Sequence, residues 1–133
     1  YENTKQVISF LKRQKKVKEI LYPYKTSSKN YKLWKKYYSG ATGLLSIVIQ
    51  SKKKTSVIKF VNSLELFGIG YSWGGFESLA ILQELRSNKK GEYIQGRKYY
   101  RFNKDEHIVR LHIGLEDPKD LINDLKSSLR YVK

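Results

Sequence analysis

The chain has 133 residues, 40% of them hydrophobic, which is enough for one domain with its own core. It has no cysteine, and this excludes disulfides, thiol nucleophiles and zinc sites built on cysteine. The formal net charge of +15 indicates attraction to anionic partners, although lysines spread along a chain are also typical of a solvated surface.

No apolar run approaches the length of a membrane span, and no charged and apolar leader opens the sequence. We therefore expect a soluble, cytoplasmic protein without membrane contact. The sequence begins at Tyr1 and contains no methionine. We expect it to be a piece of a longer protein.

The first forty residues predict a helix, a strand and a short second helix. Apolar residues at helical spacing make residues 2–16 an amphipathic helix, whose beginning we expect upstream of this sequence. The alternating residues 17–22 predict a strand that stops at Pro23. A short helix is expected around Trp34, with a stripe that faces the core and consists of Leu33, Trp34, Tyr37 and Tyr38.

The middle of the chain predicts two strands with a helix between them. Residues 44–50 are almost continuously apolar, which predicts an internal strand. Residues 55–64 return to helical spacing, and residues 64–70 predict a buried strand bounded by glycine. Gly74 and Gly75 should then form a loop, because glycine adopts backbone angles that are closed to other residues.

The last third of the chain predicts a loop, a strand and a helix. Residues 86–106 are polar and without periodicity, and we expect a mobile loop there. Residues 107–114 alternate, so Arg110 is predicted on the face opposite the apolar row. Asp117 before Pro118 predicts a helix N-cap, which favours turn and cap roles for Glu116 and Asp117 over an acid–base pair.

These elements predict an α/β fold, more closely an α+β sandwich. We expect about four largely antiparallel strands, with helices packed mainly on one face of the sheet. No repeat or linker divides the sequence. Residues 1–133 are therefore predicted to form a single domain.

Few residues are candidates for chemistry. His107 and His112 should lie on opposite faces of one strand, without a triad partner at suitable spacing, and metal-ligand and phosphate-loop motifs are absent from the sequence. Arg110 is the strongest candidate, because a planar guanidinium suits bidentate capture of a carboxylate. A structural ion pair is its alternative role. The segment 71–73 offers polar and aromatic groups where a strand gives way to a loop.

Three motifs carry a family resemblance in their order and spacing: YSWGGFESL at 71–79, VRLHIGLED at 109–117 and DLINDL at 120–125. On these motifs the sequence closely resembles the C-terminal domain of cystathionine β-lyases, pyridoxal-phosphate enzymes of cysteine and methionine metabolism. Tyr22, Pro23 and residues 34–43 are similar to the family as well. The resemblance covers about the last third of a family chain.

The resemblance implies a role for four residues. Arg110 would hold the α-carboxylate of the substrate, helped by Ser72 and Trp73, and Tyr71 resembles the β-lyase form rather than the form of γ-acting relatives. The full-length enzyme would be a homotetramer that converts cystathionine to homocysteine, pyruvate and ammonia. The resemblance also implies that the Schiff-base lysine and the pyridoxal phosphate belong to a missing N-terminal large domain. Residues 1–16 would be the end of a helix that continues from that domain. The fragment would then hold no catalytic, cofactor-binding or metal residue, and would be inactive.

Two other functions stay open. A small basic module could bind RNA or DNA through residues 25–38, where lysines alternate with aromatic residues. The chain could also be a non-catalytic relic of a split lyase gene. The lyase interpretation expects an amino-acid substrate and no nucleic-acid partner.

Overall fold

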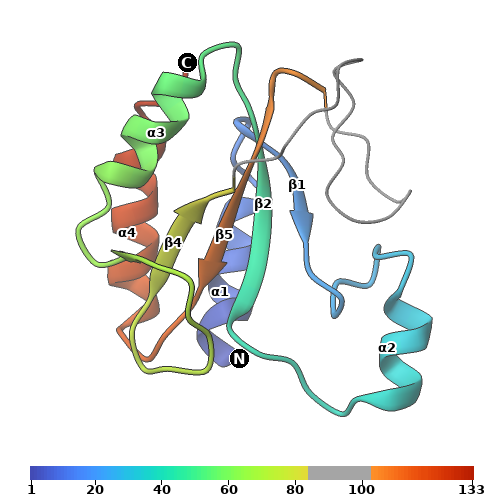
Figure 1. Ribbon diagram of the computed structural model, residues 1–133. Coiled ribbons are helices and arrows are strands. Elements are labelled where there is room, and N and C mark those ends of the chain that lie inside the picture. Colours follow the sequence, from blue (N-terminus) through green and yellow to red (C-terminus); the bar gives the residue numbers. More distant parts are fainter. Residues whose placement is uncertain (84–102) are drawn as a thin grey trace.

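A computed structural model describes residues 1–83 and 103–133 (Figure 1). Its helices are α1 (Glu2–Leu11), α2 (Tyr31–Tyr37), α3 (Lys54–Asn62) and α4 (Pro118–Leu129). Its strands are β1 (Val17–Leu21), β2 (Leu44–Gln50), β3 (Gly68–Ile69), β4 (Leu79–Leu82) and β5 (Glu106–His112). They form one sheet in the order β1-β2-β5-β4-β3.

The sheet confirms the predicted fold class. Neighbouring strands are antiparallel except β3 and β4, which pair in parallel. Among the described residues there are five strands instead of the expected four. Figure 1 shows α1, α3 and α4 on one face of the sheet, as predicted, while α2 stands apart beyond β1.

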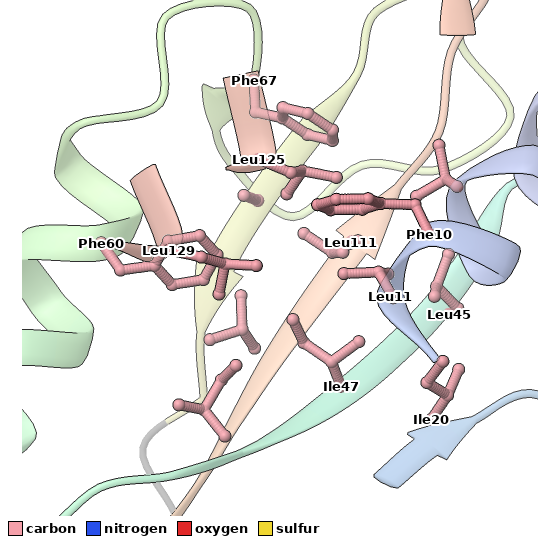
Figure 2. Close-up of a cluster of buried hydrophobic side chains, with 14 of the residues drawn as sticks. Phe10, Leu11, Ile20, Leu45, Ile47, Phe60, Phe67, Leu111, Leu125 and Leu129 are labelled. Carbon is pink, nitrogen blue, oxygen red and sulfur yellow. The ribbon is translucent and has the colours of Figure 1, made fainter. Parts of the chain in front are cut away.

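The core lies between the sheet and this helical layer. Figure 2 shows it as a cluster of buried side chains, to which α1 contributes Leu11, β2 Ile47, α3 Phe60, β5 Leu111 and α4 Leu125. Complete burial of an aliphatic or phenylalanine side chain stabilises a fold by about 1.5–3 kcal/mol. Residues from every part of the described chain therefore fix the position of β5, the strand at the centre of the sheet.

The start of α4 and the end of α1 can be compared with their predicted positions. Asp117 accepts a hydrogen bond from the Lys119 N–H at 2.8 Å, and Pro118 begins α4, as predicted. The helix predicted over residues 2–16 ends at Leu11 instead. The next five residues carry no apolar side chain that could pack on the core, and the chain leaves the helix through a turn.

The strand predicted over residues 64–70 is wrong except for Gly68 and Ile69. The backbone N–H groups of Glu65 and Leu66 donate to the Asp124 carboxylate at 2.9–3.1 Å, so they are not available to a neighbouring strand. The sheet position next to β5 is taken by β4, which the sequence analysis missed.

The predicted core-facing stripe of α2 is also wrong. No residue of this helix is buried, and Leu33, Tyr37 and Tyr38 are 58–65% exposed. The helix lies beyond the edge strand β1, away from the layer of α1, α3 and α4 that covers the sheet. The Trp34 ring packs instead on Tyr24, with 4.6 Å between the ring centres.

The mobile loop predicted over residues 86–106 lies mostly outside the described residues. Residues 103–105 form a turn, and Glu106 already belongs to β5. None of the helices in the described part of the chain combines the length and apolar character that a membrane crossing requires.

Candidate functional site

Arg110 lies on the central strand with its side chain away from the core. Its neighbours Val109 and Leu111 are fully buried in the core, which confirms the predicted alternation. The backbone of Arg110 is paired on both sides, with Ser46 of β2 and Ile81 of β4. The base of this side chain is therefore held by strand pairing on both sides.

The Arg110 guanidinium contacts the loop that follows β3, residues 71–77, which we call the clamp loop. Its Nη2 donates a hydrogen bond to the Ser72 carbonyl oxygen at 3.3 Å. The guanidinium carbon lies 5.8 Å from the centre of the Tyr71 ring and 5.5 Å from that of Trp73, within cation–π range. The structure thus brings together all four residues that the sequence analysis named as substrate-binding.

No carboxylate pairs with Arg110 within residues 1–83 and 103–133; the ion pairs found there join Lys5 with Glu2 and Lys18 with Glu106. A guanidinium has five N–H donors in a planar fork, and the Ser72 carbonyl accepts from one of them. The aromatic rings attract the cation but do not neutralise it. The arrangement suits an external carboxylate that accepts two parallel hydrogen bonds.

The clamp loop is tied to the same strand at a second point. The His112 Nε2 donates to the Gly75 carbonyl oxygen at 3.1 Å, and the Leu115 N–H donates to the Phe76 carbonyl oxygen at 2.8 Å. Gly74 has a φ of 77°, which confirms that the loop needs a glycine there. The sequence predicts no partner for His112, so its contact with Gly75 is a finding of the structure.

Glu116 ties down the end of the loop. Its carboxylate accepts hydrogen bonds from the Ser78 N–H at 2.8 Å and the Ser78 hydroxyl at 2.7 Å, and the Ser78 Oγ accepts from the Gly114 N–H at 2.9 Å. Burial raises the pKa of Glu116, but the hydrogen bonds from Ser78, together with a backbone hydrogen bond and the neighbouring His112, outweigh this effect, so its pKa lies below the ordinary value. From the sequence, Glu116 is predicted only to lie in a turn. The only signal of a larger role was that Ser78 and Glu116 both lie in the resemblance motifs.

The other candidate residues do not form a chemical site. The His107 Nε2 lies 3.1 Å from the Ser51 carbonyl oxygen, and His107 and His112 belong to opposite faces of β5. Within the described part of the chain, no group of three acidic or histidine side chains could hold a metal ion.

The described residues do not fit attachment of pyridoxal phosphate. Every lysine in residues 1–83 and 103–133 is exposed except Lys25, which is half-buried. None of the hydrogen bonds or ring contacts around Arg110 involves a lysine. In the described part of the chain, the contacts of Arg110 are thus with a backbone carbonyl and two aromatic rings.

An apolar hollow of about 740 Å³ lies elsewhere, between α2, the end of β1 and the start of β2. The Tyr22 hydroxyl, at its wall, donates to the Thr42 carbonyl oxygen at 2.8 Å. Burial, together with the neighbouring Tyr24, raises the pKa of Tyr22 to about 12. This hollow does not involve Arg110 or the clamp loop.

Several relatives match almost the whole chain. A cystathionine beta-lyase from Bordetella avium is 38% identical over 124 residues, 93% of this chain and 29% of the relative. A putative cystathionine beta-lyase from Rhizobium johnstonii is 33% identical over 95% of this chain and 31% of the relative. An L-alanine/L-glutamate racemase from Wolbachia pipientis is 34% identical over 97% of this chain and 31% of the relative. The chain thus spans about three tenths of the length of these relatives.

Solved structures have the same fold. The metB product of Corynebacterium glutamicum superposes with a TM-score of 0.74 at 26% identity, over 97% of this chain and 32% of that one. A putative O-acetylhomoserine (thiol)-lyase from Campylobacter jejuni, which carries N'-pyridoxyl-lysine-5'-monophosphate, has a TM-score of 0.70 at 29% identity, over 96% and 27%. The sequence model for Cys/Met metabolism PLP-dependent enzymes matches residues 1–130. The chain therefore belongs to the family of PLP-dependent enzymes of cysteine and methionine metabolism.

Proposed function

We propose that the chain is the C-terminal, substrate-carboxylate-binding domain of a cystathionine β-lyase-like enzyme. The observation that carries the proposal is Arg110, whose guanidinium is held by Ser72 and two aromatic rings without a carboxylate partner in the described part of the chain. The match to lyase relatives over about three tenths of their length supports it.

In this proposal the residues of the chain bind and orient the substrate. Arg110 donates two parallel hydrogen bonds to the α-carboxylate, each worth about 1.5–3 kcal/mol when a charged group takes part. Ser72 and Trp73 hold the guanidinium so that its remaining donors face the carboxylate. Because Arg110 lies on a strand paired on both sides, it would fix one end of the substrate.

The remaining part of the site would belong to an N-terminal large domain. That domain would supply the pyridoxal phosphate, its Schiff-base lysine and the catalytic groups, and the complete protein would be a cytoplasmic homotetramer. The complete enzyme would perform the β-elimination of cystathionine to homocysteine, pyruvate and ammonia. This chain alone would be inactive.

The contacts between Arg110 and the clamp loop do not distinguish a lyase from a racemase. One relative is named as an alanine and glutamate racemase, and the substrates of both enzymes carry the α-carboxylate that Arg110 would bind. The choice of a lyase rests on the lyase relatives, and Tyr71 bears only on the choice between β-acting and γ-acting forms. Activity measurements must therefore include both reactions.

A chimeric enzyme tests the proposal. The chain replaces the matched 124 residues of the Bordetella avium relative, and pyruvate release from L-cystathionine and racemisation of L-alanine are both measured. Arg110→Gln should lower kcat/KM about 10- to 100-fold, because a charged interaction with the carboxylate is lost. Arg130 is the matched control, since it is exposed at the C-cap of α4, where its Nε donates to the nearby Ser127 carbonyl oxygen. Equal effects of Arg110→Gln and Arg130→Gln contradict the proposal.

One observation favours a second function, nucleic-acid binding through α2. Leu33, Tyr37 and Tyr38 are exposed, with Lys32, Lys35 and Lys36 beside them in the sequence, and exposed aromatic rings near cations can stack on single-stranded bases. A fluorescence titration with a single-stranded oligonucleotide tests it. Binding that weakens steeply with added salt supports this function, and no binding at low salt excludes it.

A further inference from the structure

We propose that His112 is a positioning residue for Arg110, and that it acts by holding the clamp loop together with the Ser78–Glu116 pair. That the ligand of Arg110 is a substrate carboxylate rests on the proposed function. The contacts that hold the loop do not depend on the identity of that ligand.

Arg110 and His112 hold the loop from the same face of β5. They are two residues apart on one strand, so their side chains lie on the same side of the sheet. Arg110 donates to the carbonyl oxygen of Ser72, and His112 donates to that of Gly75. Two positions on the same face of the central strand therefore hold two carbonyl groups of one loop.

His112 is the firmer of these two supports. Its side chain is only 4% exposed, and its backbone is paired with Leu44 on one side and Leu79 on the other. A Cβ on Gly43 would lie 3.2 Å from the His112 Cε1, so the ring lies close against the Gly43 backbone. The imidazole therefore has little freedom to follow a moving loop.

The hydrogen bond also fixes the tautomer of His112. A carbonyl oxygen accepts only, so Nε2 must carry the proton that points at Gly75. Nδ1 is buried and has no hydrogen-bond partner in the described part of the chain. The contact with Gly75 is therefore the one hydrogen bond that the described structure gives this ring.

The other end of the loop is held through Ser78. The Ser78 N–H and hydroxyl donate to Glu116, while the Gly114 N–H donates to the Ser78 Oγ. The residues that touch Arg110 lie before these attachments, and residues 71–77 are all exposed. Since little burial holds this loop, its hydrogen bonds set the place of Ser72, Tyr71 and Trp73.

The position of the loop determines how Arg110 is presented. The bond from Arg110 Nη2 to Ser72 is 3.3 Å long, at the weak end of the range, so Arg110 alone cannot hold the loop firmly. A displacement of about 1 Å in a binding group can cost about 100-fold in rate. His112 thus affects carboxylate capture without touching the carboxylate.

The test measures the order of the Arg110 side chain in the 133-residue chain by ¹⁵N relaxation of its Nε–Hε group. His112→Leu removes the donor and should lower the order parameter of this group and speed amide exchange in the clamp loop. His112→Gln keeps an N–H at nearly the same reach and should restore both. His107→Leu is the matched control, because His107 lies on the same strand but contacts Ser51, and it should change neither.

The inference is overturned if His112→Leu leaves the order of Arg110 unchanged, or if His112→Gln loosens Arg110 as much as His112→Leu does. A loss of thermal stability shared by both variants, without a difference in Arg110 order, also overturns it, because a merely structural role predicts that result. If His112→Leu does not fold, Ser78→Ala gives the same readout from the other attachment. It should loosen Arg110, and an unchanged order parameter contradicts the inference.

The same samples separate this inference from the proposed function. If the wild-type chain does not bind L-alanine but His112→Leu still loosens Arg110, the proposed ligand is wrong and the positioning role stands. If L-alanine binds equally well to the wild type and to His112→Leu, the carboxylate site stands and the positioning role is wrong.

Discussion

The Glu116 carboxylate accepts both hydrogen bonds that Ser78 can donate, from its N–H at 2.8 Å and from its hydroxyl at 2.7 Å. This contact joins the segment just before α4 to the end of the clamp loop. Asn3 of α1 donates to the Glu116 carbonyl oxygen at 2.9 Å, so the first helix reaches the same point. Residues near both ends of the described chain, Asn3 and Glu116, thus help to hold the clamp loop in place.

The stability of the chain should depend on Glu116 at acid pH. The pKa of Glu116 is lower in the folded chain than its ordinary value of 4.5. The resulting stabilisation is complete above that value and disappears as the pH falls through the lower, folded pKa. The free energy of unfolding by urea should therefore fall more between about pH 5 and pH 3 in the wild type than in Glu116→Gln.

Glu106 provides a baseline for this comparison. Burial raises the pKa of Glu106, but its bonds to Lys18 and Asn103 outweigh this effect, and its pKa is lowered as well. The wild type and Glu116→Gln both contain Glu106, so both lose the same stabilisation from Glu106 as the pH falls. Equal losses in the wild type and in Glu116→Gln contradict the role assigned to Glu116.

Asp124→Ala should destabilise the fold. The buried Asp124 carboxylate accepts hydrogen bonds from the backbone N–H groups of Glu65 and Leu66, which have no strand partner. Removing it should lower the free energy of unfolding by about 1–3 kcal/mol in urea titrations. Asn123→Ala, at an exposed position of the same helix, should change it by less than about 0.5 kcal/mol, and a similar loss for both contradicts the prediction.

Gly114→Ala should displace the clamp loop. A Cβ at this position would lie 2.1 Å from the Phe76 carbonyl oxygen and 2.7 Å from the Glu77 carbonyl carbon, so backbone must move. We expect a loss of about 1–3 kcal/mol in unfolding free energy and shifted amide resonances in residues 71–77. Gly40→Ala, where nothing lies within 4 Å, should leave both unchanged. Unchanged loop resonances in Gly114→Ala are the contrary result.

Tyr22 should make the fold sensitive to alkaline pH. The pKa of Tyr22 is raised from 10.0 to about 12, chiefly by burial, so folding favours the neutral phenol. This contribution is complete below the unfolded pKa and is lost as the pH rises through the folded one. The wild type should lose more unfolding free energy than Tyr22→Phe between about pH 9.5 and pH 11.5. If the wild type and Tyr22→Phe lose the same unfolding free energy over this pH range, the ionisation of Tyr22 does not affect stability.

The features that could be predicted from the sequence are those that depend on neighbouring residues. Asp117 and Pro118 mark the start of α4 because capping involves only neighbouring residues. The face of Arg110 followed from the two-residue period of a strand. The strand prediction failed over residues 64–70, because the N–H groups there are bound by Asp124, 59 positions further along the chain.

The residues of the candidate site could be predicted from the sequence, but the contacts that hold them in place could not. Arg110, Tyr71, Ser72 and Trp73 could be named from motifs, and the structure brings them together. The bond between His112 and Gly75 could not be foreseen, since it depends on how a loop folds back over a strand. For α2, an apolar stripe alone does not show whether the same chain supplies the surface that it covers.

The most direct test of the central claim is a titration of the ¹⁵N-labelled chain with L-cystathionine, followed at the Arg110 Nε–Hε resonance. The account predicts a saturable shift at Arg110, no comparable shift at Arg130, and a much smaller shift at Arg110 with the diamide of cystathionine, which lacks the carboxylates. A shift of equal size at both arginines, or an equal response to the diamide, would contradict the claim that Arg110 is a carboxylate-binding residue.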